Sequence, residues 1–439
     1  MKKVLLSLIA VMVTFTAFAQ SKGDKITLNL QNGSSINMNL AEEDANAITS
    51  LKHTADGKLE IYTSNSSTPT NIYNIGEIAN LTFSINKSSE ESAVEAVKNM
   101  GLGFNLGNTM DIIATWLNMN NNSVTQFETA WGQKKTTKAM MDFLKKEGFN
   151  AVRVPVTWFQ HMKEDGTVDE KWMKRVQEIV DYVIDNDMYC ILNVHHDTGA
   201  DDGNTKHWIK ADWDNYNTNK DKFEYLWTQI ANRFKDYNHH LVFEGYNEML
   251  DANSTWNAPK NSSSYKGLNG YAQSFVNAVR ATGGNNATRN LIVNTYAAAS
   301  GNGVLNNLTI PTDQVEGHIA VEVHTYAPWD WFATKGKWDS SCTNEIKNMF
   351  TRLNSKFISK GIPCIIGEYG THGSKSVDKN STDAQKQAAA DQAADIVKQA
   401  KAYGVATFYW MSIFDGTDRT VPQWTLPTVV EAMKKAYNE

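Results

Sequence analysis

The apolar run Tyr189-Cys190-Ile191-Leu192-Asn193-Val194 ends in three polar residues, His195-His196-Asp197. A short run of this kind, bounded by polar residues, is typical of a buried β-strand. Seven more runs share its character, at 103–106, 151–154, 241–244, 291–294, 319–323, 364–367 and 407–410. Segments with helical spacing lie between most of them, at 138–147, 170–185, 223–237, 271–281, 345–359, 384–402 and 429–437. From residue 93 onward the chain therefore alternates strand and helix.

Eight strand-then-helix units predict a (β/α)8 TIM barrel, a fold of the α/β class. The alternative is an open doubly wound sheet, which usually carries a glycine-rich phosphate turn after its first strand. Gly101-Leu102-Gly103 lacks that pattern. The barrel also predicts where chemistry lies, because the active site of such a barrel is built at the C-terminal ends of its strands.

The first residues have the composition of an export signal. Lys2 and Lys3 precede an apolar run that ends near Thr14, and Ala17-Phe18-Ala19 is a small-x-small cleavage site. We assign residues 1–19 to a signal peptide. Because the run is too short for a permanent membrane helix and no cysteine follows the cut, we expect no membrane anchor and a periplasmic or extracellular protein.

Residues 20–88 have a different composition. Apolar and polar residues alternate in four short segments, at 25–30, 35–40, 59–62 and 81–84, which predict β-strands. We interpret this part as a small β-rich module of unknown role. Residues 89–439 form the barrel domain in this interpretation, with the polar stretch around residue 88 as the junction.

Composition excludes several classes of protein. The 439 residues carry a formal net charge of −6, so the chain has no broad attraction for phosphate backbones and we expect no nucleic-acid partner. Three cysteines, Cys190, Cys342 and Cys364, are too few for a disulfide scaffold or a four-cysteine zinc site. One pairing among them stays open, since export is oxidising. We expect a monomer.

Six of the eight predicted strands end in polar, titratable or aromatic side chains. They are Arg153 in the second, His195 and His196 after the third, Asn247 and Glu248 after the fourth, His324 and Tyr326 after the sixth, Glu368 in the seventh and Trp410 in the eighth. A barrel built only for stability does not need them there. Two further carboxylates, Glu244 and Glu322, precede these ends, and we place them lower in the barrel in structural positions.

Glu248 and Glu368 follow the fourth and seventh strands, which face one another across a barrel mouth. Two carboxylates across a cleft are the groups used in glycoside hydrolysis. One protonates the leaving oxygen, and the other attacks the anomeric carbon or activates water. The alternative is that each glutamate is half of a salt bridge at a strand end.

Residues 95–439 resemble glycoside hydrolase family 5, which includes endoglucanases and mannanases. The resemblance rests on short blocks in the family's order, including Gly103-Phe104-Asn105-Leu106-Gly107-Asn108-Thr109, Asn150-Ala151-Val152-Arg153-Val154-Pro155, Asn193-Val194-His195-His196-Asp197, Gly245-Tyr246-Asn247-Glu248, His324-Thr325-Tyr326 and Gly367-Glu368-Tyr369-Gly370. It implies a retaining mechanism with Glu248 as acid/base and Glu368 as nucleophile. It does not extend to residues 20–88.

The implied roles carry electrostatic expectations. Glu248 must be protonated at the first step, so its pKa should lie above the ordinary value. Glu368 must be ionised, with Arg153 and the Tyr326 hydroxyl holding it so. The other substrate-binding residues that we expect are Asn247 at the 2-hydroxyl, His195, His196 and His324 around the central sugar, and Trp410 as its apolar floor.

Tryptophans are abundant after the predicted strands, and flat indole rings suit the apolar faces of sugars. The loop tryptophans are Trp116, Trp131, Trp158, Trp208, Trp213, Trp256, Trp329 and Trp331, each of which has loop packing as its alternative role. Trp172 and Trp227 lie within helical patterns and are expected in the core.

A metal site at His195-His196-Asp197 is disfavoured, because neighbouring strand residues point to opposite faces and His-Glu-x-x-His is absent. We therefore expect no metal and no cofactor. The sequence predicts a secreted, retaining endo-hydrolase of β-1,4-linked glucan (cellulose, mixed-linkage glucan or xyloglucan). The alternatives are an endo-β-1,4-mannanase with the same residues, and a glycan-capture protein whose N-terminal module is the main binder.

Overall fold

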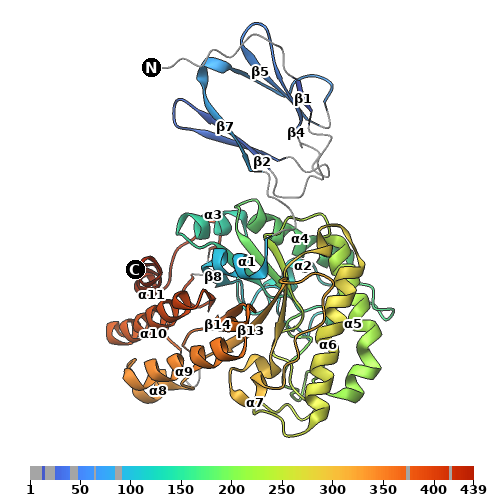
Figure 1. The fold of residues 1–439 in the computed structure, drawn as a ribbon, viewed down its shortest axis with the longest axis vertical. Coiled ribbons are helices and arrows are strands. Elements are labelled where there is room, and N and C mark those ends of the chain that lie inside the picture. The colour runs from blue at the N-terminus through green and yellow to red at the C-terminus, as the bar shows by residue number, and fades with distance from the viewer. Residues whose placement is uncertain are drawn as a thin grey trace. The chain divides into compact units, whose positions relative to one another are not determined.

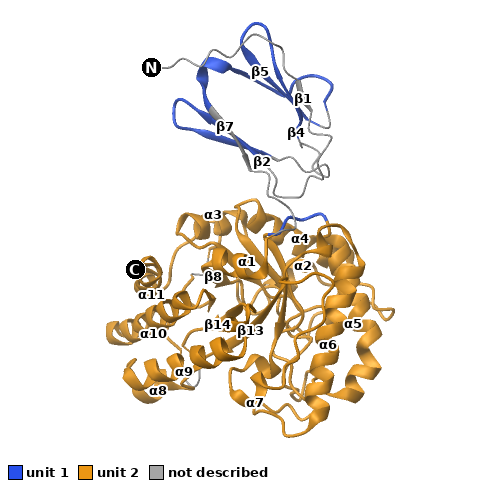
Figure 2. Ribbon diagram, in the orientation of Figure 1, with its two compact units in different colours: residues 1–90, 236–239 blue, residues 91–235, 240–439 orange. Residues whose placement is uncertain are grey.

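The computed structural model describes residues 12–14, 25–39, 48–63, 66–84, 91–371, 376–414 and 418–439. They divide into two compact units (Figure 2), residues 1–90 with 236–239 and residues 91–235 with 240–439. The expected cleavage site Ala17-Phe18-Ala19 and the expected junction near residue 88 lie outside the described residues.

The larger unit is a closed barrel of eight parallel strands in sequential order (Figure 1). The strands are β8 (Leu102–Asn105), β9 (Ala151–Val154), β10 (Tyr189–Asn193), β11 (Leu241–Glu244), β12 (Leu291–Asn294), β13 (Ile319–Thr325), β14 (Cys364–Tyr369) and β15 (Ala406–Trp410). The pairing of β15 with β8 closes the ring. The predicted (β/α)8 fold is confirmed, and the open sheet is excluded.

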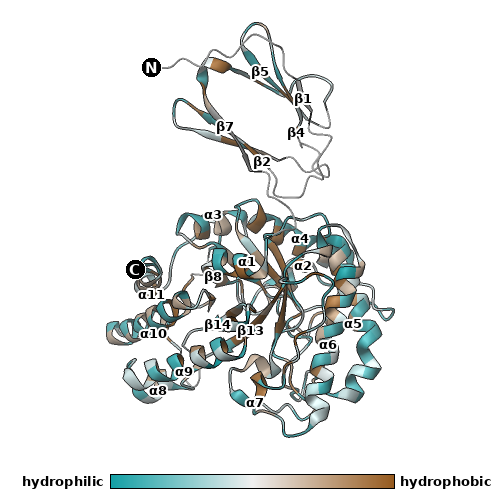
Figure 3. Cartoon of the chain, in the orientation of Figure 1, coloured by the Kyte–Doolittle hydropathy of each residue, from teal (hydrophilic) through white to brown (hydrophobic). Residues whose placement is uncertain are grey.

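Helices surround the barrel. They are α1 (Ala93–Met100), α2 (Val124–Glu128), α3 (Lys138–Lys146), α4 (Glu170–Ile184), α5 (Trp213–Arg233), α6 (Ser262–Ala281), α7 (Asn302–Leu305), α8 (Trp331–Lys335), α9 (Ser340–Lys356), α10 (Asp383–Ala402) and α11 (Pro427–Asn438). The strands are buried along their length, and polar residues cover the outer sides of the helices (Figure 3). This is the layer order that a parallel barrel requires.

Helices α5 and α6 begin about ten residues before the start that their apolar spacing predicts. The pattern marks α5 only from Phe223, yet the helix starts at Trp213, where the Asp212 side chain accepts hydrogen bonds from the backbone N–H groups of Asp214 and Asn215. Asn261 caps α6 in the same way. Few apolar residues stand before Phe223 in α5 and before Tyr271 in α6, so the capping residues are the clearest sequence signal of the two starts.

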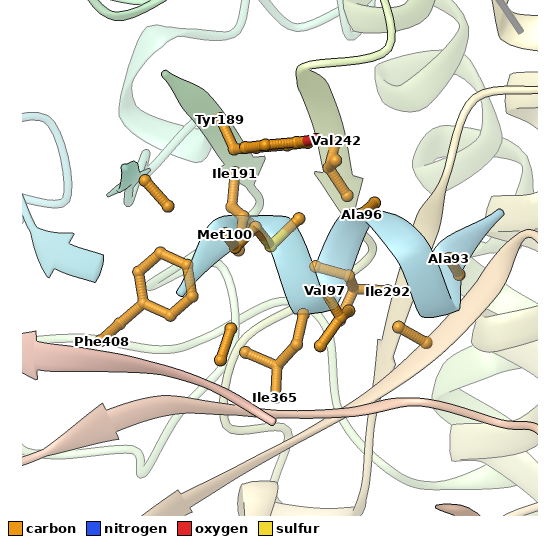
Figure 4. Close-up of a cluster of buried hydrophobic side chains, with 13 residues drawn as sticks. Ala93, Ala96, Val97, Met100, Tyr189, Ile191, Val242, Ile292, Ile365 and Phe408 are labelled. Atoms are coloured by element: carbon orange, nitrogen blue, oxygen red, sulfur yellow. The ribbon is translucent and has the colours of Figure 1, made fainter. Parts of the chain in front are cut away.

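Helix α1 closes the N-terminal end of the barrel. Its apolar side chains Ala93, Ala96, Val97 and Met100 pack against the first residues of the strands (Figure 4). Ser92 and Glu95 form a capping box at its start. A hydrophobic cluster therefore fills this end of the barrel. The polar residues at the strand ends lie at the opposite end, the C-terminal mouth.

The smaller unit consists of antiparallel strands in two sheets. One has the order β1 (Met12–Thr14), β4 (Ile48–His53), β5 (Lys58–Thr63), β6 (Asn71–Asn74), and the other β3 (Ser35–Asn39), β2 (Lys25–Leu30), β7 (Ile78–Ser84). The sheets share a small core of Ile26, Leu28, Ile48, Leu51, Leu59 and Ile61. Strands β4 and β6 were not predicted, because their alternation is weak, and β1 was not predicted because it lies in the segment assigned to the signal peptide.

None of the described helices combines the length and the apolar character that a membrane crossing would need. Cys190, Cys342 and Cys364 are all buried and free. The disulfide that the sequence left open is therefore not formed. Trp172 and Trp227 are fully buried, as expected.

Candidate active site

The predicted site residues gather at the C-terminal ends of the barrel strands. Arg153 lies in β9, His324 in β13, Glu368 in β14 and Trp410 at the end of β15. The remaining residues, His195, His196, Asn247, Glu248 and Tyr326, follow the ends of β10, β11 and β13. Parallel strands in one closed ring bring these ends to a single mouth, so residues far apart in sequence become neighbours.

Glu368 reaches the mouth through an irregularity in β14. Val323 of β13 pairs with Ile366, but the next residue, His324, pairs with Glu368, so Gly367 is an extra residue on β14. A bulge of this kind re-aims the side chain that follows it. Gly367 therefore sets Glu368 opposite His324.

The Glu368 carboxylate is buried and held at both oxygens. Nη1 of Arg153 donates to Oε1 over 2.8 Å, and the Tyr326 hydroxyl donates to Oε2 over 2.8 Å. The His324 ring lies 3.6 Å from Oε2. Burial and the charge of Glu248 nevertheless outweigh these favourable contacts, so the pKa of Glu368 is raised.

Asn247 and Glu248 both lie beyond the last residue of β11, Glu244, so strand alternation does not separate them. Nη2 of Arg153 donates to the Asn247 side-chain oxygen over 2.8 Å, which turns the amide nitrogen of Asn247 away from Arg153. Oε1 of Glu248 lies 2.8 Å from Nδ1 of His324. The Glu248 side chain keeps 22% of its surface exposed, against 7% for Glu368.

His324 is surrounded by carboxylates. Burial opposes a charge on its ring, but the charge of Glu368 and the hydrogen bonds to Glu248 and Glu322 prevail and raise the pKa of His324 to about 10. Burial of Glu248 is in turn outweighed by the hydrogen bond from His324, which lowers the pKa of Glu248. This direction is opposite to our expectation, because the proton that we placed on Glu248 resides on His324 in the free protein.

A buried polar layer lies beneath these residues. Nε and Nη2 of Arg153 donate to the two oxygens of Glu244 over 2.7 and 2.8 Å, and Glu244 also accepts from Asn193 and Asn294. Glu322 lies 3.3 Å from Nε of Arg153. Glu244 and Glu322 are fully buried, in the lower positions that the sequence assigned to them.

His195 is oriented by the residue that shares its strand face. Nδ2 of Asn193 donates to Nδ1 of His195 over 3.0 Å, so the remaining nitrogen, Nε2, carries the proton and lies 4.0 Å from Oε1 of Glu368. Burial keeps the pKa of His195 well below its ordinary value. The ring is parallel to that of Trp410, with centroids 6.0 Å apart.

A cleft of about 460 Å³ opens beside Glu248. Asn247, Glu248 and His196 form part of its wall, and three of the eight loop tryptophans line it: Trp116, Trp131 and Trp256. Trp116 and Trp256 expose 65% and 56% of their surface. Trp158 and Trp331, by contrast, are fully buried, so their role is packing.

Sequence reasoning missed much of this cleft. Its other lining residues come from the loops after β8 and β10: Ile113, Thr115, Thr198, Gly199, Ala200, Asp202, Asn204, Thr205 and His207. The same reasoning overlooked Asn105, whose amide bridges Arg153 and the backbone oxygen of Gly367. Only the tryptophans gave a signal in these loops, because polar loop residues look alike whether or not they line a cleft.

Two groups of side chains have the donor atoms of a metal site within 4.8 Å of one another, Asp111 with His195 and His196, and Glu248 with His324 and Glu368. Asp111 accepts from the backbone N–H groups of Asn108 and Thr109. Glu248 and Glu368 are hydrogen-bonded to His324, Tyr326 and Arg153. These contacts account for both groups, and we assign neither a metal.

The arrangement is suited to splitting the bond between an acetal carbon and its departing oxygen. One carboxyl group, Glu248, shares a proton with a histidine and faces an aromatic cleft. The other, Glu368, is aligned by a guanidinium and a phenol, and its oxygen lies within 4.8 Å of an oxygen of Glu248. One carboxyl group can therefore protonate the oxygen of such a bond while the other attacks its carbon.

Comparisons with known proteins agree with this chemistry. Residues 115–416 match the family described as cellulase, glycosyl hydrolase family 5. Endoglucanase A of Clostridium longisporum is 33% identical over 371 residues, which span 80% of this chain and 67% of that protein. The cellulase/esterase CelE of Acetivibrio thermocellus is 35% identical over 365 residues, which span 78% of this chain but only 40% of CelE.

One solved structure is more similar to this chain in sequence than these two relatives are. PbGH5A, a glycoside hydrolase family 5 enzyme from Prevotella bryantii B14, is 59% identical to this chain, with a TM-score of 0.76. The alignment covers 79% of this chain and 99% of PbGH5A. A mutant of PbGH5A has been solved in complex with the xyloglucan tetradecasaccharide XXXGXXXG.

Proposed function

Because the chain belongs to glycosyl hydrolase family 5, we propose that it is an exported, retaining endo-hydrolase of β-1,4-linked glucans, with Glu248 as acid/base and Glu368 as nucleophile. Endoglucanases are among its relatives. The observation that supports the mechanism is the approach of the two carboxyl groups, since one oxygen of Glu248 lies within 4.8 Å of one oxygen of Glu368. Inverting hydrolases hold their carboxyl groups about 6.5–9.5 Å apart to admit a water molecule.

In the first step Glu368 attacks the anomeric carbon while Glu248 protonates the departing glycosidic oxygen. The negative charge of Glu368 falls as its bond to carbon forms. Asn247, oriented by Arg153, presents its amide to the 2-hydroxyl of the same sugar. The product of this step is a glycosyl ester on Glu368.

In the second step Glu248, now ionised, removes a proton from water, and the water oxygen attacks the anomeric carbon. Glu368 leaves with the electron pair of the ester bond. Two inversions give net retention of the β configuration. NMR observation of the first sugar released should therefore show the β-anomer, and early α-anomer would replace this scheme with inversion.

Among β-glucans we propose that the protein accepts decorated chains such as xyloglucan. The similarity to PbGH5A, solved with a xyloglucan tetradecasaccharide, supports this choice. The open cleft beside Glu248, with two well-exposed tryptophans, also suits a bulky chain rather than a narrow tunnel. The test is a panel of soluble cellulose derivative, mixed-linkage glucan, xyloglucan and β-mannan at equal mass. Preference for mannan would overturn the assignment in favour of a mannanase.

Export is proposed from the composition of residues 1–19. Strand β1 (Met12–Thr14) lies inside this segment and pairs with β4, so cleavage after Ala19 would remove one edge strand of the smaller unit. Sequencing the N-terminus of protein recovered from outside the cytoplasm tests the proposal. An N-terminus at Gln20 supports it, whereas an intact Met1 contradicts it.

A further inference from the structure

Glu322 is a buried carboxylate with an unusual position below the site. It lies on β13, two residues before His324, and its side chain has no exposed surface. Oε1 of Glu322 lies 3.2 Å from Nε2 of His324, while Nδ1 on the other side of the same ring lies 2.8 Å from Oε1 of Glu248. One imidazole thus bridges a deeply buried carboxylate and the proposed acid/base.

Gly367 leaves the space that the Glu322 carboxylate occupies. A Cβ atom at Gly367 would lie 1.9 Å from Oε1 of Glu322, which no side chain at that position could tolerate without moving Glu322. Gly367 is also the extra residue of the bulge that sets Glu368 opposite His324. The same glycine therefore serves the placement of both Glu322 and Glu368.

We infer that Glu322 is a positioning residue that holds a proton on Nε2 of His324, so that the ring can carry a second proton on Nδ1 and supply it to Glu248. This inference rests on the proposed acid/base role of Glu248. It assigns to Glu322 a part in leaving-group protonation, although Glu322 touches no substrate.

Proton transfer balances along this chain of groups. When the glycosidic oxygen departs, Glu248 takes a proton from Nδ1 of His324 and passes it to that oxygen. The His324 ring becomes neutral and keeps the proton on Nε2, next to Glu322. When water attacks in the second step, its proton passes to Glu248 and back to Nδ1. Above about pH 7 Glu322 stays ionised throughout, and no net proton is gained or lost.

The surrounding charges support a cationic ring. The titratable groups that act on His324 or Glu322 are Glu248, Glu368, Glu244, Arg153 and His195. His196 and Tyr326 act on Glu248 and Glu368. Three carboxylates act on His324, and their combined effect overcomes its burial and raises its pKa to about 10. Burial and the neighbouring Glu244 raise the pKa of Glu322 to about 7, so Glu322 is ionised above about pH 7 and binds a proton below it.

The test replaces Glu322 with glutamine, which keeps the shape and an accepting oxygen but removes the charge. kcat/KM is measured across pH on xyloglucan and on a dinitrophenyl β-cellobioside, whose leaving group needs no proton. We expect Glu322→Gln to lose about tenfold more on xyloglucan than on the aryl glycoside. Because a lost negative charge weakens proton binding by the His324–Glu248 pair, the alkaline limb on xyloglucan should move to lower pH.

Glu244→Gln is the matched control. Glu244 is equally buried, but it is hydrogen-bonded to Arg153, Asn193 and Asn294. Its loss should lower activity on both substrates alike. The inference would be overturned if Glu322→Gln lost equal kcat/KM on the two substrates, or if its alkaline limb on xyloglucan did not move. Glu248→Ala tests the acid/base role of Glu248 separately from the inference about Glu322. If this variant lost equal activity on the two substrates, the acid/base role itself would be refuted.

The wild-type protein provides a second measurement if Glu322→Gln does not fold. NMR of protein labelled with ¹⁵N-histidine should show His324 with both ring nitrogens protonated at pH 8, while His195 and His196, whose pKa values are lowered, are neutral. The His324 signals are assigned by their loss in His324→Gln. A neutral His324 ring at pH 8 would overturn the inference.

Discussion

The Tyr326 hydroxyl donates a 2.8 Å hydrogen bond to Oε2 of Glu368. Arg153 occupies the other oxygen at the same distance, so both oxygens of this buried carboxylate are bound by donors. Such donors stabilise the ionised form, which is the form that can attack carbon. They also fix the direction of the carboxylate, because the Arg153 guanidinium is itself anchored on Glu244.

Replacing Glu368 with glutamine should abolish turnover while leaving substrate binding intact. The amide keeps the size of the side chain but cannot form the ester, so we expect kcat to fall at least about a thousandfold. Isothermal titration with a long oligosaccharide should still detect binding. Glu431→Gln, a change of an exposed glutamate on α11, is the control and should behave as wild type. A Glu368→Gln variant within tenfold of wild type would remove Glu368 from the mechanism.

Replacing Glu248 with alanine should separate the two steps. Natural glycans need a protonated leaving group, so their kcat/KM should fall by about 100- to 10,000-fold. An aryl glycoside with a good leaving group should still form the glycosyl ester on Glu368. Added azide, which needs no base, should then accelerate turnover and give a β-glycosyl azide. An α-azide, or no rescue on either substrate, would contradict the double-displacement scheme.

The barrel could be predicted because each of its strands has a clear sequence pattern. Runs such as Leu291-Ile292-Val293-Asn294 are short, apolar and bounded by polar residues, and all eight became strands. The ends of these strands also indicated where the site lies, because a closed ring of parallel strands brings all their C-terminal residues to one end of the barrel. Glu368, His324 and Arg153 were found by this geometry.

Other features depend on contacts that no local pattern reveals. The bulge at Gly367 is set by the pairing of β13 with β14, and the residue alone gives no hint of it. The proton on His324 depends on Glu248, Glu322 and Glu368, which lie on three separate segments. The sequence therefore predicted which groups gather at the mouth of the barrel but placed the proton on Glu248.

Replacing Trp116 or Trp256 with alanine should weaken the binding of long substrates. Both rings are exposed at the cleft that Glu248 borders, where they can cover the apolar faces of sugars. We expect KM for xyloglucan to rise about two- to tenfold for each, with smaller changes in kcat. Trp329 exposes 67% of its surface but does not line the cleft, so Trp329→Ala is the matched control. An equal effect of all three changes would exclude a specific role for the cleft tryptophans.

Removal of divalent metal ions should leave activity unchanged. Glu248, Glu368 and His324 are hydrogen-bonded to other side chains, and the proposed reaction needs only carboxyl, imidazole and phenol groups. The check is prolonged dialysis against a chelator, followed by assay on xyloglucan with and without added calcium, magnesium or zinc. Activity that disappears and returns with one ion would require a metal, whose position would then have to be located relative to the cleft.

Stability should depend on pH through His161, a residue that takes no part in the proposed reaction. Its ring stacks on Trp172 at 3.5 Å, and burial lowers its pKa from 6.5 to about 3. The folded state therefore holds His161 neutral, whereas the unfolded chain binds a proton as pH falls below about 6.5, so stability is lost between pH 6.5 and 3. Between pH 7.5 and 4.5 this single group should cost about 2–3 kcal/mol. Urea denaturation of wild type and His161→Phe at both pH values measures it, because phenylalanine keeps the ring but cannot titrate. The wild type should lose that much more than the variant on acidification, and an equal loss in both would show that His161 is not the group responsible.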